Sequence, residues 1–77
     1  MQQINIVIGK VLKEEREARH LSQENLAFDA GLHRTYISQI ERGLKNVTVK
    51  VLFDITKAMN MDFVEFITKV NNGIKEL

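Results

Sequence analysis

Apolar residues recur along the chain at helical spacing, and they rarely alternate with polar residues as they would in a strand. Near the start, Val7 and Val11 lie four residues apart. Ile8 and Leu12 repeat that spacing, and charged residues fill the neighbouring positions. The pattern predicts five helices, over residues 6–20, 23–30, 34–42, 49–59 and 62–72. We therefore expect an all-α fold.

Residues that favour helix ends lie between these segments. Ser22 and Thr48 are good N-caps for the second and fourth helices, because their hydroxyls can accept hydrogen bonds from free backbone N–H groups. Asp62 can cap the fifth helix or place an acid in its first turn. Gly31 and Gly43 are expected to stop the second and third helices in the left-handed conformation that glycine adopts easily.

The connection between the second and third helices is very short. Only Leu32 and His33 separate Gly31 from the third helix. Two helices joined by so short a glycine-containing turn cannot lie antiparallel, and they must cross at a steep angle, as in a helix-turn-helix. The other helices are then expected to pack behind this pair.

The third helix has one apolar side and one polar side. At about 100° per residue, Ile37 and Ile40 fall on the apolar side. Tyr36 and Glu41 lie at the margins of that side. The opposite side carries a continuous row of hydrogen-bonding side chains, which are Arg34, Thr35, Ser38, Gln39 and Arg42. This row is either an ordinary solvated helix face or a binding surface.

The distribution of charge favours a surface that binds an anion. The whole chain has a net charge of +1, which argues neither for nor against a nucleic-acid partner. Residues 31–50 hold four basic residues against one acidic residue, a net charge of +3. Together with the short turn and the glycines at both ends of the third helix, this charge favours DNA over a plain solvated face.

The polar row suits the major groove of DNA, which admits one α-helix and presents donors and acceptors on the base edges. Arg34 can bind guanine in a fork, Gln39 can pair with adenine, and the Thr35 methyl can contact a thymine methyl. The surrounding polar side chains suit backbone phosphates, and these are Gln23, Arg42, Lys45, Asn46 and Lys50.

Glu41 lies beside the predicted core, where a carboxylate is costly unless it is paired. Arg16 is the candidate partner, because it falls one turn beyond Leu12 on the side of the first helix that should face the third. The alternative is that Glu41 is a solvated residue near a helix end.

The C-terminal helix carries more apolar surface than so small a domain should bury. Its stripe consists of Phe63, Phe66, Ile67, Val70, Ile74 and Leu77. Phe53 adds to this excess from the fourth helix. The stripe is either ordinary core packing or a homodimer interface, for which the predicted residues are Phe53, Phe63, Ile67 and Val70.

Several other chemistries are not expected. The chain has no cysteine and two histidines, His20 and His33, so we expect no metal site and no cofactor. No candidate nucleophile or general base stands apart, so we expect no enzyme. No apolar run reaches the roughly 18 residues of a membrane span, and we expect a cytoplasmic protein without a small-molecule ligand.

The motif over residues 21–43, LSQENLAFDAGLHRTYISQIERG, resembles the Xre family of helix-turn-helix regulators, the group of the lambdoid phage repressors. The similarity continues through residues 47–62, VTVKVLFDITKAMNMD. Within this family, the pattern HRTYIS…IERG…N in a very short chain most resembles the controller proteins of restriction–modification systems. These are dimeric transcription factors that regulate their own gene and the endonuclease gene.

The resemblance implies a lambda-repressor-like domain over residues 1–77, whose last helix contributes to a dimer. It places Tyr36 and Ser38 at the bases together with Arg34, Thr35 and Gln39, and it implies that Arg16 and Glu41 form an internal ion pair. The implied partners are operator DNA and a second copy of the chain. RNA polymerase is a further partner that the resemblance leaves open. Xre-type antitoxins and phage repressors share these motifs, so a protein that acts partly through another protein is the alternative.

Overall fold

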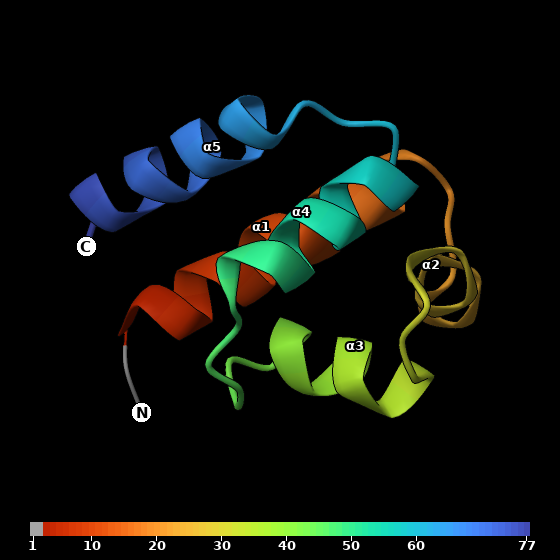
Figure 1. Ribbon diagram of the computed structural model, residues 1–77. Helices are drawn as coiled ribbons and strands as arrows, with labels where there is room; N and C mark the ends of the chain where they lie inside the picture. The colour runs from red at the N-terminus through yellow and green to blue at the C-terminus, as the bar shows by residue number, and fades with distance from the viewer. Residues whose placement is uncertain (1–2) are drawn as a thin grey trace.

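The computed structural model describes residues 3–77, which form helices and no strand. The elements are α1 (Gln3–Ala18), α2 (Gln23–Ala30), α3 (Arg34–Glu41), α4 (Val49–Ala58) and α5 (Phe63–Lys75) (Figure 1). The prediction of an all-α fold with five helices is confirmed.

Each helix packs closely against two of the others. One side of α1 packs against α5 and another side packs against α3 (Figure 1). The second helix touches both α3 and α4, and α4 also packs against α5. The polar third helix is therefore held from behind by α1 and α2.

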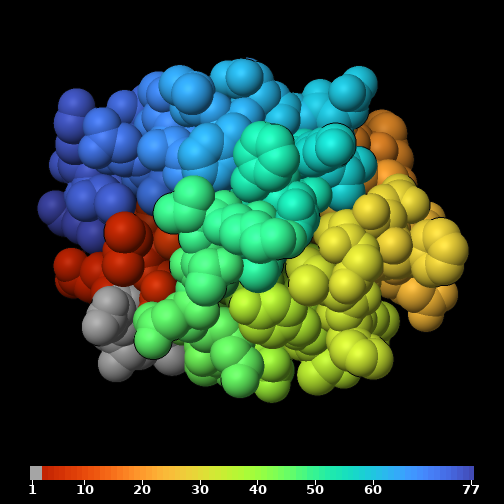
Figure 2. All heavy atoms as spheres, viewed as in Figure 1, coloured from red at the N-terminus to blue at the C-terminus, as the bar shows by residue number. Residues whose placement is uncertain are grey.

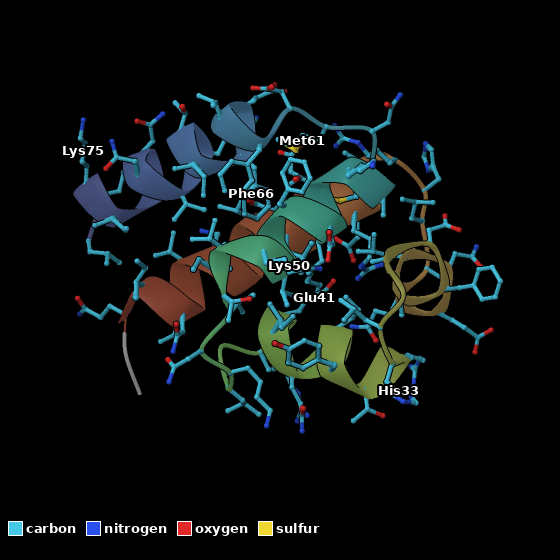
Figure 3. The ribbon with its side chains drawn as sticks, in the orientation of Figure 1. His33, Glu41, Lys50, Met61, Phe66 and Lys75 are labelled. Atoms are coloured by element: carbon cyan, nitrogen blue, oxygen red, sulfur yellow. The ribbon has the colours of Figure 1, made fainter. Side chains whose placement is uncertain are left out.

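All five helices contribute to one hydrophobic core. Each supplies a large side chain that is fully shielded from solvent, and these side chains are Leu12, Leu26, Ile37, Ile55 and Phe66. Figure 3 shows Phe66 between α5 and α4. Burying a side chain of this size contributes roughly 1.5–3 kcal/mol to the free energy of unfolding, so the core fixes where each helix lies.

The first four helices end in the same way. Each is followed by a residue in the left-handed conformation, and these residues are His20, Gly31, Gly43 and Asn60, with φ between 56° and 76°. The next residue then donates its N–H to a carbonyl five positions earlier, at 2.8–3.2 Å. This is the Schellman motif, which satisfies the free carbonyls of a helix end and turns the chain sharply.

The predicted capping roles of three residues are confirmed. The side chains of Ser22, Thr48 and Asp62 each accept a hydrogen bond from the N–H three residues further on, at 2.9–3.1 Å. Asp62 is thus the cap of α5 and lies outside it. The predicted ends of the third and fourth helices are each one residue too late.

The limits of the first and last helices were predicted wrongly. The first helix begins at Gln3, three residues before the predicted start, because Ile4 lies one turn before Ile8 and both line the same apolar groove. It also ends at Ala18, since His20 adopts the left-handed conformation. The fifth helix continues to Lys75 through Gly73, where it packs closely against the Val7 side chain of α1.

Candidate nucleic-acid interface

The two central helices have the geometry of a helix-turn-helix. Gly31, with φ of 72°, ends α2, and the N–H of Leu32 bonds to the carbonyl of Ala27 at 2.8 Å. The chain then passes through His33 in an extended conformation and enters α3. Figure 1 shows α2 end-on and α3 from the side, so the two axes cross steeply, as the short turn predicts.

The third helix is anchored by its apolar side. Ile37 and Ile40 are buried in the core, and Tyr36 packs against it from the margin. The predicted division of this helix into an apolar and a polar side is confirmed for these three residues. As a result, α3 and the loop after it form one edge of the molecule, and α5 lies at the opposite edge (Figure 2).

The polar row lies on the outer side of α3. Arg34, Thr35 and Arg42 are exposed, and Ser38 and Gln39 are half-buried. The row therefore combines two cationic side chains with a hydroxyl and an amide that keep access to solvent. These groups supply donors and acceptors of the kinds that base edges can match.

The cationic side chains in this row and directly after it have no acidic partner among residues 3–77. Within residues 3–77, Arg34, Arg42 and the exposed Lys45 take part in no ion pair. His33, which precedes α3 (Figure 3), makes no capping hydrogen bond with its side chain. The positive charge of this edge is thus available to an external anion.

Two predicted phosphate contacts already have partners inside the protein. The Lys50 Nζ atom lies 2.8 Å from a carboxylate oxygen of Asp54 on the exposed surface of α4. The Asn46 side-chain oxygen accepts a hydrogen bond from Asn5 on α1 at 2.7 Å. An exposed ion pair of this kind is worth at most about 1 kcal/mol, so Lys50 can exchange Asp54 for a phosphate. Asn46 keeps the N–H groups of its amide.

A buried ion pair links α1 to α3 at the back of the interface. The Arg16 guanidinium binds both carboxylate oxygens of Glu41, at 2.6 and 3.0 Å. The side chains are only 10% and 3% exposed, and Glu41 lies on the side of α3 that faces the rest of the molecule (Figure 3). The hydrogen bond to Glu41 raises the pKa of Arg16 above its ordinary value, even though burial opposes this. This is the pair expected from the sequence.

Glu41 also holds a residue of the predicted interface. The Gln23 amide donates a hydrogen bond to the Glu41 carboxylate at 3.0 Å, which fixes the orientation of its side chain. An amide has two N–H donors, and the second N–H of Gln23 has no partner among residues 3–77. Sequence reasoning missed this contact, because it depends on how closely α2 and α3 approach each other at their crossing.

The predicted dimer residues divide between surface and core. Val70 is buried in the core of its own chain, so the structure does not place it on a free surface. Phe63 is half-buried, and its ring packs against Phe53 with centroids 6.1 Å apart. Phe53 is 50% exposed and Ile67 is 37% exposed. Phe53 and Ile67 are therefore the two of these four side chains with most surface available to a partner.

An open apolar groove continues this surface. It has a volume of 510 Å³ and lies between the start of α1, α4 and α5. Its most exposed apolar residues are Ile4, Val49 and Val64, none of which was predicted from the sequence. Ile4 was missed because the first helix was expected to begin later. Val64 was missed because it lies outside the apolar stripe of α5.

Other kinds of site find no support in the part of the chain that is described. Residues 3–77 bring together no group of three or more side chains that could ligate a metal ion. The same residues include no helix with both the length and the apolar character that a membrane crossing requires.

Comparisons with known proteins agree with this geometry. A sequence model of the helix-turn-helix family matches residues 12–66. Control protein C.BamHI of Bacillus amyloliquefaciens is 41% identical over 69 residues, which covers 84% of this chain and 85% of that protein. Control protein C.SmaI of Serratia marcescens is 38% identical over 72 residues, which covers 94% of this chain and 83% of that protein.

A solved structure extends the comparison to the fold. The restriction–modification controller protein C.Esp1396I, crystallised as a tetramer with its natural 35 base-pair operator, is 33% identical to this chain with a TM-score of 0.87. The match covers 94% of this chain and 95% of that one. The chain therefore belongs to the helix-turn-helix family, in the group that contains the restriction–modification control proteins.

Proposed function

We propose that the protein is a sequence-specific regulator of transcription that binds a near-palindromic operator as a homodimer. We further propose that it controls a restriction–modification system by regulating its own gene and the endonuclease gene. The observation that carries this proposal is the polar, cationic row on the outer side of α3, held there by Ile37 and Ile40. The control proteins among its relatives support the biological role.

In this proposal α3 enters the major groove. Arg34, Thr35 and Gln39 contact base edges, with Tyr36 and Ser38 beside them. The surrounding contacts go to the phosphate backbone, which fixes the register of the helix without reading sequence. They come from Gln23, Arg42, Lys45, Asn46 and Lys50. The bond from Gln23 to Glu41 suits this role, because it holds the amide in place before DNA arrives.

The homodimer would form through the exposed apolar surface of α4 and α5. Phe53 and Ile67 lie on this surface, and the groove lined by Ile4, Val49 and Val64 extends it. Two copies would present two α3 helices about 34 Å apart, the spacing of successive major grooves on one side of DNA. The operator complex of C.Esp1396I supports assembly on DNA as a property of this group.

A gel-shift titration with the DNA upstream of the protein's own operon tests the proposal. We expect binding at least about a thousandfold tighter than to a random duplex of equal length, at fixed salt. Raising the salt concentration should weaken binding to both duplexes, since phosphate contacts release counterions. Equal affinity for the two duplexes would contradict the proposal.

The apolar groove favours one alternative function. A regulator of the antitoxin or phage-repressor type would use the 510 Å³ groove for a different protein and bind DNA in part through that partner. Purification from the native host separates the two cases. A second small protein that stays bound through gel filtration favours the alternative, and a self-paired dimer at micromolar concentration favours the controller. In both cases the protein would act in the cytoplasm, where the DNA is.

A further inference from the structure

Gly9 on α1 touches the backbone of α3. A Cβ atom at this position would lie 2.6 Å from the carbonyl oxygen of Glu41 and 2.9 Å from its carbonyl carbon. It would lie closer still to the carbonyl oxygen of Ile40. Carbon atoms normally rest about 3.5–4.0 Å apart, and backbone atoms cannot rotate out of the way as a side chain can. Any side chain at Gly9 must therefore push α1 and the end of α3 apart.

Two more contacts support the same end of the helix. Gly43, which stops α3, rests against Ile6, so that an added Cβ would lie 3.1 Å from the Ile6 Cα atom. Asn5 holds the following loop through its 2.7 Å hydrogen bond to Asn46. We call Asn5, Ile6 and Gly9 the α1 seat, and Figure 1 shows the start of α1 beside the C-terminal end of α3.

We propose that Gly9 is a positioning residue for base reading, because it sets how closely the C-terminal end of α3 approaches α1. This inference rests on the proposed function. The helix has eight residues and is about 12 Å long, so a displaced end tilts the whole polar row. Hydrogen bonds tolerate only a few tenths of an ångström. The pairing of Arg34 and Gln39 with base edges would fail first, while the flexible Lys45 could still reach a phosphate.

Gly73 on α5 provides a matched control. It is also a helical glycine packed against α1, but an added Cβ would meet a side-chain atom, the Val7 Cγ1 atom at 2.7 Å, and no backbone atom of α1 within 4 Å. It contacts the side of α1 that faces α5. Gly73→Ala thus adds the same methyl group at the other helix contact of α1, the one with α5, without touching α3.

The experiment compares the wild type, Gly9→Ala and Gly73→Ala at a temperature where circular dichroism shows each variant folded. Affinities for the operator and for a random duplex are measured at one salt concentration, and their ratio is the readout. We expect Gly9→Ala to reduce this ratio at least about tenfold, the loss of one bidentate base contact. Its affinity for the random duplex should stay within about twofold of the wild type, since phosphate contacts persist. Gly73→Ala should leave the ratio unchanged.

The outcomes separate this inference from the proposed function. If the wild type prefers the operator and Gly9→Ala keeps that preference, the positioning role of Gly9 is overturned and the proposed function stands. A wild type without any preference would overturn both. Should Gly9→Ala fail to fold, Ile6→Ala takes its place, because it removes a half-exposed side chain from the α1 seat without a clash. It should reduce the ratio about threefold, and an unchanged ratio would overturn the inference.

Discussion

At the scale of single residues, the Glu41 carboxylate connects three helices. It lies on α3, accepts hydrogen bonds from Arg16 on α1 and Gln23 on α2, and is almost fully buried. Arg16 in turn donates to the carbonyl of Leu21 in the connection that leads into α2, at 2.8 Å. Arg16 and Gln23 compensate the cost of burying the Glu41 carboxylate. Removing Glu41 or Arg16 therefore leaves the opposite charge buried without its partner.

Glu41→Ala should therefore be strongly destabilising. The substitution leaves Arg16 as an uncompensated buried charge, and we expect a loss of about 3–5 kcal/mol in the free energy of unfolding. Urea unfolding followed by circular dichroism measures it. Glu17→Ala is the control, because Glu17 lies 3.9 Å from the same guanidinium but is 58% exposed, and it should cost less than about 1 kcal/mol. Equal losses in the two variants would contradict a structural role for the buried pair.

Arg34 and Lys45 should differ in how they affect DNA binding. Arg34→Ala should cost about 1–3 kcal/mol for the operator and relax the preference at one base position. Lys45→Ala should weaken binding to all sequences alike and reduce the slope of log affinity against log salt by about one. Gel shifts with single-base operator variants, repeated at several salt concentrations, distinguish the two. A uniform loss for Arg34→Ala would place it at a phosphate.

At the scale of elements, the turns between the helices depend on four residues in the left-handed conformation. Glycine adopts this conformation without steric cost and provides two of them, Gly31 and Gly43. His20 and Asn60 provide the other two, although the backbone of a residue with a Cβ atom is strained in the left-handed conformation. Asparagine tolerates the conformation better than most residues, which leaves His20 as the most strained of the four helix ends.

Opposite substitutions at two of these ends should have opposite effects. His20→Gly removes the strain and should stabilise the fold by about 0.5–1 kcal/mol. Gly31→Ala introduces strain alone, because an added Cβ meets nothing within 4 Å, and it should cost about 1 kcal/mol. Thermal unfolding would show shifts of roughly 4–8 °C per kcal/mol in a domain of this size. A lower melting temperature for His20→Gly would show that its side chain makes a stabilising contact.

The sequence allowed the helices and the division of α3 into an apolar and a polar side to be predicted, because both follow from spacing and capping within one segment. Ser22 and Thr48 act locally, and so do Ile37 and Ile40. Features that depend on two elements meeting were missed. The bond from Gln23 to Glu41 and the burial of Val70 arise from helix packing, and no pattern within α2 or α5 indicates either one.

At the scale of the whole molecule, two surfaces face different directions. The cationic row of α3 occupies one edge, and α5 with its exposed apolar residues lies at the opposite edge (Figure 2). A second copy that binds at α4 and α5 would therefore leave both α3 helices uncovered. Under the proposed function, this separation would let one small domain pair with itself and bind DNA at the same time.

Val64→Asp should convert the proposed dimer to a monomer. Val64 is 67% exposed and lines the apolar groove, so the charge costs the single chain little but would be buried in a dimer. Analytical ultracentrifugation at micromolar concentration measures the change, and operator affinity should fall with it. Phe28→Asp is the control, because Phe28 is 85% exposed but lies on α2, away from the groove. A dimer that persists in Val64→Asp would place the interface elsewhere.

The stability of the whole domain should fall in acid partly through Glu15, which joins α1 to α5. It lies 2.9 Å from Arg19 and 3.3 Å from Lys69. Burial raises the pKa of Glu15, but the hydrogen bonds and charges of Arg19 and Lys69 outweigh burial and hold the pKa below its ordinary value of 4.5. Because this pKa is lower in the folded state, the stabilisation is complete above about pH 4.5 and is lost as the pH falls through the folded-state pKa.

Glu15→Gln should remove that contribution. The variant should be less stable than the wild type at pH 7, and the difference should shrink between pH 5 and pH 3, since the wild type loses its carboxylate there. Urea midpoints measured across this range check the expectation. If the urea midpoints of the two proteins change with pH in parallel, Glu15 does not contribute to the pH dependence of stability.

The separation of the buried anchor residues of α3 from its exposed polar residues has a consequence for how new specificities would arise under the proposed function. Ile37 and Ile40 hold the helix, whereas Arg34 and Thr35 are exposed and contribute little to folding. Exposed substitutions usually change stability by no more than about 0.5 kcal/mol. The exposed part of the polar row can therefore vary one residue at a time while the domain stays folded. If the proposed function holds, such a scaffold can evolve, or be engineered, toward different operators without passing through unstable intermediates.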